Sequence, residues 1–453
     1  MKKRTFLRLA GAIGAGWLFS PLVRLRAKGK MPEKLKNSAG NIDYSTENLH
    51  RAKSVNDAKV YVRKTDKLKV LGTRHCFNTI ADSKDGFLSL TELPDAPVID
   101  AAARTVTIDA NMTYGRLAPW LEEKGYALHN LASLPHISVA GAVSTATHGS
   151  GENNGNLSTA VTGLEIVTAN GELLQLSRNK DGETFRGAVV GLGALGAIMK
   201  VTLEIQPAFQ ARQWVYQNMP MEAVEAHFDE IEGSGYSVSL FTDWRNRNVN
   251  EVWIKDRIGG AKQFEAKPEF FGAKLAKKNL HPIAEISAEN CTEQMGAPGP
   301  WYDRLPHFKM GFMPSAGKEL QSEFFVPRKD AVEAILALEK LYEEISPHLL
   351  ITEIRAIAAD DLWLSPCYQQ DSVAIHFTWQ QDWPAVKAVL PELEKALAPF
   401  AVRPHWGKLF TLEPAVLRSR YKKLTEFVEL AQKYDPQGKF RNEFLNRHVF
   451  AIR

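Results

Sequence analysis

Two pairs of polar residues in the second half of the sequence have the spacing of neighbours on one face of a β-strand. Glu353 and Arg355 flank Ile354, and His376 and Thr378 repeat this spacing further along the chain. Because side chains alternate across a strand, each pair points to one side while the apolar residue between its members points to the core. Two such strands lying side by side would build one polar wall, which suits a polar substrate. A solvent-exposed sheet face with a surface ion pair fits the spacing equally well.

A histidine in the first part of the chain lies in a turn that contains glycine. This residue is His75, and it follows a predicted strand within the stretch VLGTRHCFN, residues 70–78. On its own, a histidine in such a turn is most often an ordinary loop residue. A second stretch favours function, because residues 132–151 read ASLPHISVAGAVSTATHGSG and are mostly small. Such a run lets backbone N–H groups converge on a pyrophosphate without obstruction by Cβ atoms, and its hydroxyls add donors.

A dinucleotide fingerprint is matched literally by the sequence GLGALG, which contains Gly191, Gly193 and Gly196. The fingerprint requires a strand before it, a helix after it and an acidic residue about 20 positions further on. Here residues 199–205 are predicted to form a strand, and residues 211–220 contain no Asp or Glu. We interpret the glycines as a turn at which the backbone approaches another group closely.

Apolar patterns predict an α+β arrangement for residues 48–207. We expect a strand at 106–108, an amphipathic helix at 114–124, and a hairpin over 164–176 that turns at Asn170-Gly171.

A second α+β part is predicted beyond Pro207, because strands there have helices on one face. The expected strands are residues 237–244, 251–255, 323–326, 350–357 and 372–379, and the expected helices are 332–345 and 386–397. The stretch 262–306 is rich in Lys, Pro and Gly, and we expect a long excursion that covers the site.

Length and composition set the broad class. The chain has 453 residues, of which 44% are hydrophobic and 24% charged, so it is long enough for two large soluble domains. The net charge is +4, Lys and Arg are spread along the whole sequence, and much of the excess lies in the first 30 residues, so no basic face for nucleic acid is indicated. Cys76, Cys291 and Cys367 cannot all pair, and no His, Cys or Asp cluster has the spacing of zinc or iron ligands. We therefore expect no protein-bound metal.

The N-terminus has the pattern of an export signal. Lys2, Lys3 and Arg4 precede residues 9–23, which contain no charge and are too few and too rich in glycine to span a bilayer comfortably. The sequence KRTFLR, residues 3–8, resembles a twin-arginine signal with lysine in place of the first arginine. We expect a signal peptide over residues 1–27, export to the periplasm and no stable membrane anchor after processing. The alternatives are an ordinary secretory signal or an uncleaved anchor.

Through the stretches around His75 and residues 132–151, the chain resembles the FAD-linked oxidases of the vanillyl-alcohol oxidase superfamily. The resemblance is closest to alditol (xylitol) oxidases and more distant to aldonolactone oxidases. It implies a two-domain α+β fold. The FAD-binding domain would comprise residues 28–207, the substrate domain, with an antiparallel sheet and helices, residues 208–409, and the segment 410–453 would return to the FAD domain.

The resemblance also implies which residues hold the cofactor. FAD would be attached through its 8α-methyl group to His75, and one linkage is expected because residues 131–151 contain no cysteine. This histidyl bond withdraws electrons from the flavin and should raise its potential. The family often has serine where this chain has Cys76, so a hydroxyl contact there would be lost. The remaining FAD contacts are expected at Val70, Leu71, Gly72, Thr73, Arg74, Cys76, Ser133, Ser138, Gly141, Thr145, Ala146, Thr147, His148 and Ile198.

On the substrate side, the resemblance implies a terminal CH–OH of a small polyol that gives a hydride to flavin N5, after which O₂ reoxidises the flavin to yield H₂O₂. Arg355 and Lys408 would bind the reacting hydroxyl and favour its alkoxide-like form, and Glu353 completes the catalytic set. Ala132 is expected beside the flavin as an oxygen gatekeeper, since a small residue leaves room for O₂. The remaining hydroxyls would be bound by Glu353, His376, Thr378 and Ser133.

Two other functions fit the sequence. The first is an aldonolactone oxidase or a dehydrogenase that passes electrons to a quinone or cytochrome. The second is a sugar-binding protein that keeps the fold without flavin, although the intact His75 and the run of small residues argue against it.

Overall fold

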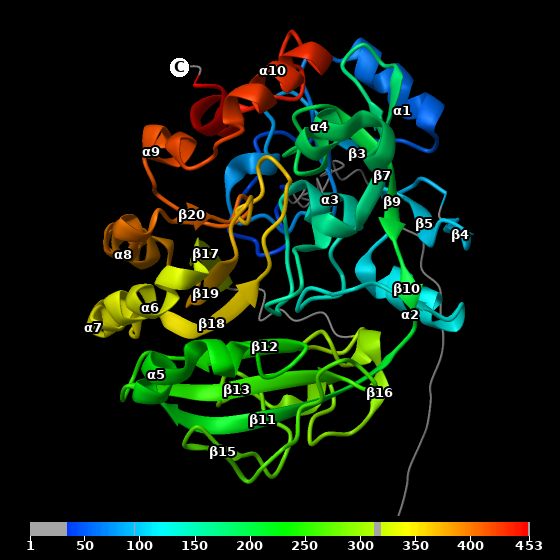
Figure 1. Ribbon diagram of the computed structural model, residues 1–453. Helices are drawn as coiled ribbons and strands as arrows, with labels where there is room; N and C mark the ends of the chain where they lie inside the picture. Colours follow the sequence, from blue (N-terminus) through cyan, green and yellow to red (C-terminus); the bar gives the residue numbers. More distant parts are fainter. Residues whose placement is uncertain (1–33, 95, 312–318, 452–453) are drawn as a thin grey trace, which may run out of the picture. The chain divides into compact units, whose positions relative to one another are not determined.

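The computed structural model describes residues 34–94, 96–311 and 319–451 (Figure 1). Residues 35–453 form one compact unit. The expected signal peptide, residues 1–27, lies outside the described residues. Within the described ranges, every helix is either too short or too polar to cross a membrane.

A small parallel sheet near the start of the chain leads into the turn that carries His75. Its strand order is β1 (Leu49–Arg51), β3 (Phe87–Ser89) and β2 (Lys69–Leu71). Helix α1 (Val55–Lys64) begins where the Ser54 side chain accepts a hydrogen bond from the Asp57 N–H. The helix then packs its buried face beside these strands.

A five-stranded antiparallel sheet follows. Its order is β4 (Val98–Asp100), β5 (Thr105–Asp109), β9 (Ala197–Glu204), β7 (Val161–Val167) and β8 (Leu173–Ser177). The predicted strand at 106–108 lies in β5, and the predicted hairpin is β7–β8, with Gly171 in its turn at φ 77°. The predicted helix is α2 (Tyr114–Glu123). These three predictions are confirmed.

The glycine turn at residues 191–196 has the order of elements opposite to a dinucleotide fingerprint, as expected. Helix α4 (Arg178–Val189) precedes it and strand β9 follows it. Gly196 has a φ of 148°, and a Cβ there would lie 2.4 Å from the Val167 carbonyl oxygen. Glycine is therefore required because the turn passes directly against β7.

The second half of the chain builds a ten-stranded antiparallel sheet. Its order is β14-β15-β11-β13-β12-β18-β19-β17-β20, with β16 paired to β11. The central strands are β11 (Gln210–Pro220), β13 (Asn248–Arg257), β12 (Ser237–Thr242), β18 (Leu349–Ile357), β19 (Ser372–Gln380), β17 (Glu319–Pro327) and β20 (Arg403–Pro404). Four of the five strands predicted in this region fall within β13, β17, β18 and β19, and the fifth, 237–244, begins with β12 but extends two residues beyond it.

Helices cover one face of this sheet, on the left in Figure 1. They are α5 (Met221–Glu232), α6 (Ala331–Glu339) and α8 (Trp383–Leu397), and their buried residues join those of the strands in one core. The helix predicted over 332–345 is wrong in one respect. It ends at Glu339, a separate turn α7 (Tyr342–Ile345) follows, and Tyr342 is 46% exposed rather than part of the core.

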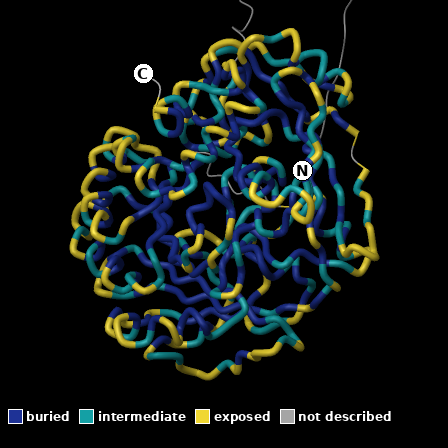
Figure 2. Tube along the Cα trace, turned by 45° about the horizontal axis from the view of Figure 1, so that its top comes forward, coloured by how far each residue is buried: buried dark blue, intermediate teal, exposed yellow. Residues whose placement is uncertain are grey.

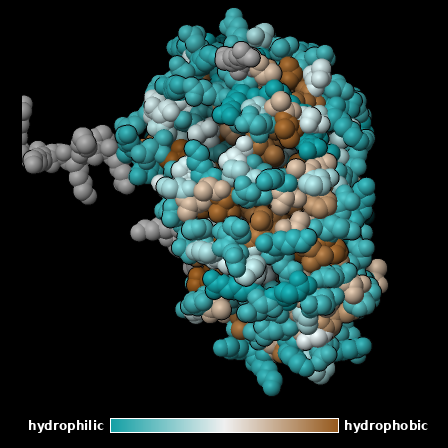
Figure 3. All heavy atoms as spheres, turned by 90° about the vertical axis from the view of Figure 1, so that its left-hand side faces the viewer, coloured by the Kyte–Doolittle hydropathy of each residue, from teal (hydrophilic) through white to brown (hydrophobic). Residues whose placement is uncertain are grey.

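The outer surface of these helices is mainly polar. Figure 3 shows a largely hydrophilic face on which small groups of apolar residues are separated by polar ones. Figure 2 shows that the strands behind are buried, whereas exposed residues lie in the outer helices and loops. The sheet therefore has a second face that is buried within the protein, and this face carries the polar residues described below.

Two further segments complete the unit. The excursion after β13 contains β14 (Glu269–Phe270), β15 (Ala273–Leu275) and β16 (Gly299–Pro300). The C-terminal segment contains α9 (Pro414–Ser419), α10 (Leu424–Tyr434) and α11 (Glu443–Leu445). It lies against the first part of the chain, where the Leu68 N–H donates to the Lys439 carbonyl at 3.0 Å. The domain limits expected at residues 207 and 409 stay a prediction.

Candidate active site

Strands β17, β19 and β18 place three titratable residues side by side. The register pairs Glu323 with His376, and His376 with Glu353, and Arg355 lies two residues further along β18. Ile354 and Ile375 point to the opposite face and join the helix-covered core. The predicted alternation is thus confirmed. All four polar residues are less than 10% exposed, so the alternative of a solvent-exposed sheet face is wrong.

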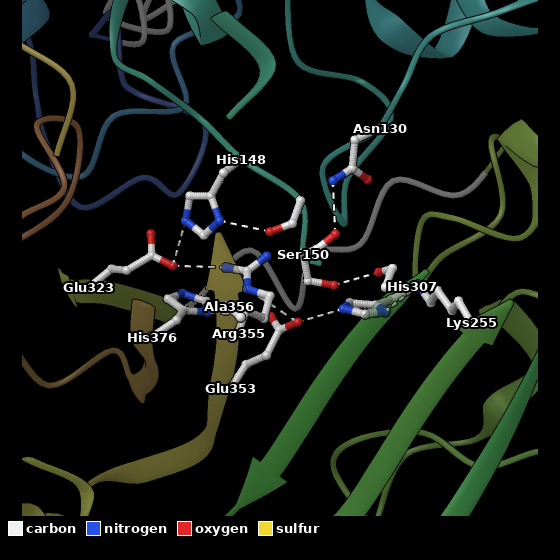
Figure 4. Close-up of polar contacts among 12 residues, drawn as sticks. Asn130, His148, Ser150, Lys255, His307, Glu323, Glu353, Arg355, Ala356 and His376 are labelled. Atoms are coloured by element: carbon white, nitrogen blue, oxygen red, sulfur yellow. Dashed lines mark hydrogen bonds and ion pairs between the residues drawn. The ribbon is translucent and has the colours of Figure 1, made fainter. Parts of the chain in front are cut away.

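Glu323 is the centre of a cluster of cations (Figure 4). Its Oε1 accepts from Arg355 Nη2 at 2.8 Å, its Oε2 accepts from Lys408 Nζ at 2.8 Å, and His148 Nε2 lies 3.1 Å from Oε1. Burial raises the pKa of Glu323, but Lys408, His148 and Arg355 together outweigh it and hold the pKa well below its ordinary value. Glu323 is therefore a buried carboxylate that fixes two cations next to each other.

Glu353 occupies the other side of Arg355. Its Oε1 lies 2.6 Å from His307 Nε2 and 3.4 Å from Arg355 Nε, and its Oε2 lies 3.9 Å from His376 Nδ1. Burial raises the pKa of Glu353, but Arg355 and His307 outweigh it and hold the pKa well below its ordinary value. The Arg355 guanidinium is thus oriented by two carboxylates, one on each side.

His376 and Thr378 lie on the same face as these groups. Burial, together with Lys408, lowers the pKa of His376 to about 4, so its imidazole is neutral near pH 7. The Nε2 atom of His376 is buried and has no hydrogen-bond partner among the described residues. A buried polar atom without a partner is costly unless a ligand satisfies it, which fits a substrate hydroxyl. Thr378 is 8% exposed.

Lys408 reaches the cluster from a loop that follows β20 and is attached to β17. The His405 N–H donates to the Glu323 carbonyl at 2.9 Å, and the Leu409 N–H donates to the Gln321 carbonyl at 2.9 Å. Burial lowers the pKa of Lys408, and Glu323 opposes this shift. The Nδ1 atom of His405 accepts from the Gly407 N–H at 3.1 Å, and its ring centroid lies 6.4 Å from that of His148.

The turn at His75 and the small-residue stretch lie together and have the features expected of an FAD site. The Ser138 N–H donates to Thr73 Oγ1 at 3.1 Å. A Cβ at Gly72 or at Gly141 would lie 2.5 or 2.8 Å from Ser138 Oγ, so glycine at both positions leaves room that any other residue would fill. Gly72 and Gly141 are exposed although their neighbours Leu71 and Ala142 are buried. These residues fit the bound pyrophosphate and ring of FAD.

His75 has a nitrogen without a partner at this place. Its ring centroid lies 4.5 Å from that of His136, and its Nδ1 is buried with no hydrogen-bond partner among the described residues. Burial, with a smaller contribution from His136, lowers the pKa of His75 to about 4. The imidazole is therefore neutral near pH 7 and keeps a nitrogen lone pair for bond formation.

Hydrogen bonds connect the FAD side with the polar wall. The Asn78 amide donates to the carbonyls of Trp406 and Lys408 at 2.8 and 2.7 Å, and the Phe77 N–H donates to the Gly407 carbonyl at 2.7 Å. The Gly151 N–H donates to the Ala356 carbonyl at 2.8 Å. The turn that carries His75 and the loop that carries Lys408 are consequently held against each other.

The other residues expected to contact FAD lie on several different elements of the structure. Val70 and Leu71 end β2, Ile198 lies on β9, and Thr145, Ala146 and Thr147 follow helix α3 (Val139–Ser144). Arg74 directs its guanidinium to the Lys36 carbonyl at 2.9 Å. The Cys76 carbonyl accepts from the Asn37 amide at 3.0 Å. His148 faces Glu323, Ala132 is buried in the core of the first part, and Ser133 is half-buried.

Three residues of the site were missed by sequence reasoning. Glu323 begins the predicted strand 323–326, whose other residues are apolar, and a single carboxylate there is a weak but usable signal. His307 lies immediately after the predicted excursion, and Lys255 ends a predicted strand. Nothing in the spacing of these two residues relates them to Glu353, because they meet it only through the fold of the sheet.

Two family models match the chain. An FAD binding domain model matches residues 50–177, and a D-arabinono-1,4-lactone oxidase model matches residues 312–448. Alditol oxidase from Streptomyces sp. is 43% identical over 92% of this chain and 99% of its own. The chain belongs to the alditol oxidase family of FAD-dependent oxidoreductases.

More distant relatives of this oxidoreductase are named as enzymes that act on lactones. L-gulonolactone oxidase from Bos taurus is 26% identical over 84% of this chain and 89% of its own, and L-gulono-1,4-lactone dehydrogenase from Mycobacterium tuberculosis is 26% identical over 85% and 91%. The crystal structure of cholesterol oxidase from B. sterolicum matches with a TM-score of 0.71 at 15% identity, over 91% of this chain and 96% of that one. This likeness confirms the predicted FAD-linked oxidase fold.

Proposed function

We propose that this enzyme oxidises a terminal CH–OH of a small alditol with covalently attached FAD, giving an aldose and H₂O₂. The observation that carries the proposal is the buried cluster in which Glu323 holds Arg355 and Lys408 together, beside the two stretches that fit FAD. The family of the chain supports an alditol as the substrate. FAD, when bound, supplies the acceptor for the hydride.

The residues of the cluster would prepare the alcohol for hydride loss. Arg355 and Lys408 bind the reacting hydroxyl, and their charges favour its alkoxide-like form by stabilising negative charge on its oxygen. Glu353 accepts hydrogen bonds from a neighbouring hydroxyl. His376, Thr378 and Ser133 bind the hydroxyls further along the chain of the polyol.

A panel of alditols and aldonolactones tests the substrate. We expect H₂O₂ to form with xylitol or sorbitol and not with L-gulono-1,4-lactone. The reverse result would favour the lactone alternative, which the lactone oxidase model over residues 312–448 supports. Stopped-flow reoxidation of the reduced enzyme by O₂ and by a quinone tests the acceptor. We expect O₂ to react faster, because the proposed place of the small Ala132 beside the flavin would leave room for it.

His75 is proposed to carry the flavin through its 8α-methyl group, because its neutral, buried imidazole has an unpartnered Nδ1. His75→Ala should lose all acid-stable flavin while retaining FAD that trichloroacetic acid releases. Turnover should fall roughly tenfold, equivalent to about 1.4 kcal/mol of transition-state stabilisation.

Mass spectrometry of the peptide that contains residue 75 measures the adduct directly. His227→Ala is the matched control, because His227 is a half-buried histidine on α5 that pairs with Glu230 at 2.9 Å and packs against Phe271, away from the turn that carries His75. An adduct that persists in His75→Ala would place the bond on another residue.

We further propose that the protein is exported to the periplasm by the signal in residues 1–27. The pattern of Lys3-Arg4 and the uncharged residues 9–23 supports this. Cell fractionation should find the mature chain in the periplasm, and a replacement of both Lys3 and Arg4 should leave it in the cytoplasm. Equal distribution of both forms would contradict export by this route.

A further inference from the structure

Behind Glu353 lies a row of buried groups to which the proposed function assigns no role. Lys255 Nζ lies 3.0 Å from His307 Nδ1, and His307 Nε2 lies 2.6 Å from Glu353 Oε1 (Figure 4). Lys255 also donates to the Leu305 carbonyl. Lys255 is 1% exposed and His307 is 5% exposed. A lysine so deeply buried in a protein is unusual unless its charge is paired with another group.

The chemistry of the three groups fixes the direction of both hydrogen bonds. Glu353 is ionised and accepts only, so His307 Nε2 carries the hydrogen. His307 is neutral near pH 7, because burial and the nearby Lys255 lower its pKa to about 4. Its Nδ1 is therefore an acceptor, and Lys255 Nζ is the donor that occupies it. Burial lowers the pKa of Lys255 to about 7, against the opposing effect of Glu353, so the ammonium form predominates below pH 7.

The imidazole has little freedom to turn away. The rings of Phe241 and Trp253 pack edge-on against it at centroid distances of 5.4 and 5.2 Å. Its backbone carbonyl accepts from the Thr292 N–H at 2.9 Å. The ring is thus a rigid connection between strand β13, which carries Lys255, and strand β18, which carries Glu353.

We propose that His307 and Lys255 are positioning residues for substrate binding: His307 Nε2–H holds Glu353 by Oε1, and Lys255 keeps the imidazole neutral by occupying Nδ1. Glu353 then retains its full negative charge, and its Oε2 is directed toward His376 and the polyol. The inference rests on the proposed oxidation of alditols, in which Glu353 accepts a hydrogen bond from a substrate hydroxyl.

Two substitutions of similar polarity separate this role from simple packing. The amide nitrogen of glutamine takes nearly the place of imidazole Nε2, whereas that of asparagine takes the place of Nδ1. His307→Gln should keep KM for the polyol within about twofold, and His307→Asn should raise KM roughly tenfold with little change in kcat, as expected for the loss of a hydrogen bond to a charged group. Equal KM values for the two variants would overturn the proposal.

Removal of Lys255 should change the pH dependence. The charged or titratable groups that face His307 are Lys255 on β13, Glu353 and Arg355 on β18, and Cys291 of the excursion beside Lys255. Without the ammonium, burial still lowers the pKa of His307 but the effect of Lys255 is removed, so Glu353 raises this pKa from about 4 toward the ordinary value of about 6.5. A protonated imidazole would then neutralise Glu353 and weaken its hold on the polyol.

In Lys255→Met, we therefore expect KM to rise as the pH falls from 7 to 5, while the wild type stays constant over this range. The double variant with His307→Gln should lose this rise, because an amide does not titrate. A constant KM in Lys255→Met, or an equal rise in the wild type, would contradict the proposal. This comparison also decides the question if His307→Asn does not fold.

Controls keep the inference separate from the proposed function. His281→Gln changes a half-buried histidine of the same excursion whose Nδ1 accepts from the Ile283 N–H, and should leave KM unchanged. Flavin content and melting temperature are measured for every variant. If the wild type oxidises no alditol, the proposed function fails; if it does and the His307 variants behave alike, only the inference fails.

Discussion

Replacing Glu323 with glutamine is expected to destabilise this enzyme by about 3–5 kcal/mol and to reduce its turnover by roughly 10²–10³ or more. Glu323 is 1% exposed and holds Arg355, Lys408 and His148 within 3.1 Å. An amide has the same shape but no charge, so it leaves Lys408 without the carboxylate it pairs with and Arg355 with only one of its two carboxylates. It also presents an N–H group to a guanidinium or an ammonium, which must then move away.

The pH dependence of unfolding provides a second measurement. The folded pKa of Glu323 lies well below the ordinary carboxyl value, so its contribution to stability is fully present above about pH 4.5 and is lost as the pH falls toward the folded pKa. The free energy of unfolding of Glu323→Gln should therefore differ most from the wild type above pH 4.5. Below that value the two curves should converge.

Glu319→Gln is the control for the loss of a carboxylate on the same strand. Glu319 begins β17 and accepts from the Gln321 amide at 2.7 Å, and in the described part of the chain it forms no hydrogen bond or ion pair with Arg355, Lys408 or His148. We expect its replacement to change stability and turnover only slightly. A Glu323→Gln enzyme with wild-type turnover would show that Arg355 and Lys408 keep their positions without this carboxylate.

Much of the polar wall could be predicted from the sequence, because strand alternation is a local property. A strand conformation is enough to place Glu353 and Arg355 on one side and Ile354 on the other, and β18 has this arrangement. The same reasoning located His376 and Thr378. It could not predict how deeply this face is buried, however, because a polar face with these spacings is also compatible with exposure to solvent. The burial of this face is decided by the first part of the chain packing onto it.

Contacts between distant segments could not be predicted in this way. Glu323 meets Lys408 because the loop after β20 is hydrogen-bonded to β17, and His148 reaches Glu323 from the stretch interpreted as binding FAD. His307 is separated from Glu353 by strand β17 in sequence, yet the two lie 2.6 Å apart. These pairs follow from the order of strands in the ten-stranded sheet, which residue patterns alone do not specify.

Lys408→Met is expected to lower kcat by roughly 10²–10³, the usual cost of removing one group that stabilises developing charge on oxygen. The loss should appear mainly in kcat, because the ammonium acts most strongly on the alkoxide-like oxygen that forms during the reaction. KM should change little, since His307 and Arg355 still hold Glu353 for the other hydroxyls. The flavin attachment proposed at His75 should remain, because His75 lies on a different segment.

The pH profile identifies the lysine more specifically than the rate does. Lys408 has a lowered pKa, caused first by burial, and only its charged form stabilises the alkoxide. Activity of the wild type should therefore fall as the pH rises through this pKa, at a pH below the ordinary value for lysine. Lys408→Met should lack this fall in activity, the alkaline limb of the pH profile. Lys408→Arg should retain part of the activity and also lack the alkaline limb, because arginine stays charged.

A surface lysine provides the comparison for these variants. Lys422 is exposed in the segment before α10, and Lys422→Met should leave both kcat and its alkaline limb as in the wild type. If Lys408→Met kept the wild-type kcat, or kept the alkaline limb, the negative charge would have to be stabilised by Arg355 alone. The cluster around Glu323 would then position one catalytic cation rather than two.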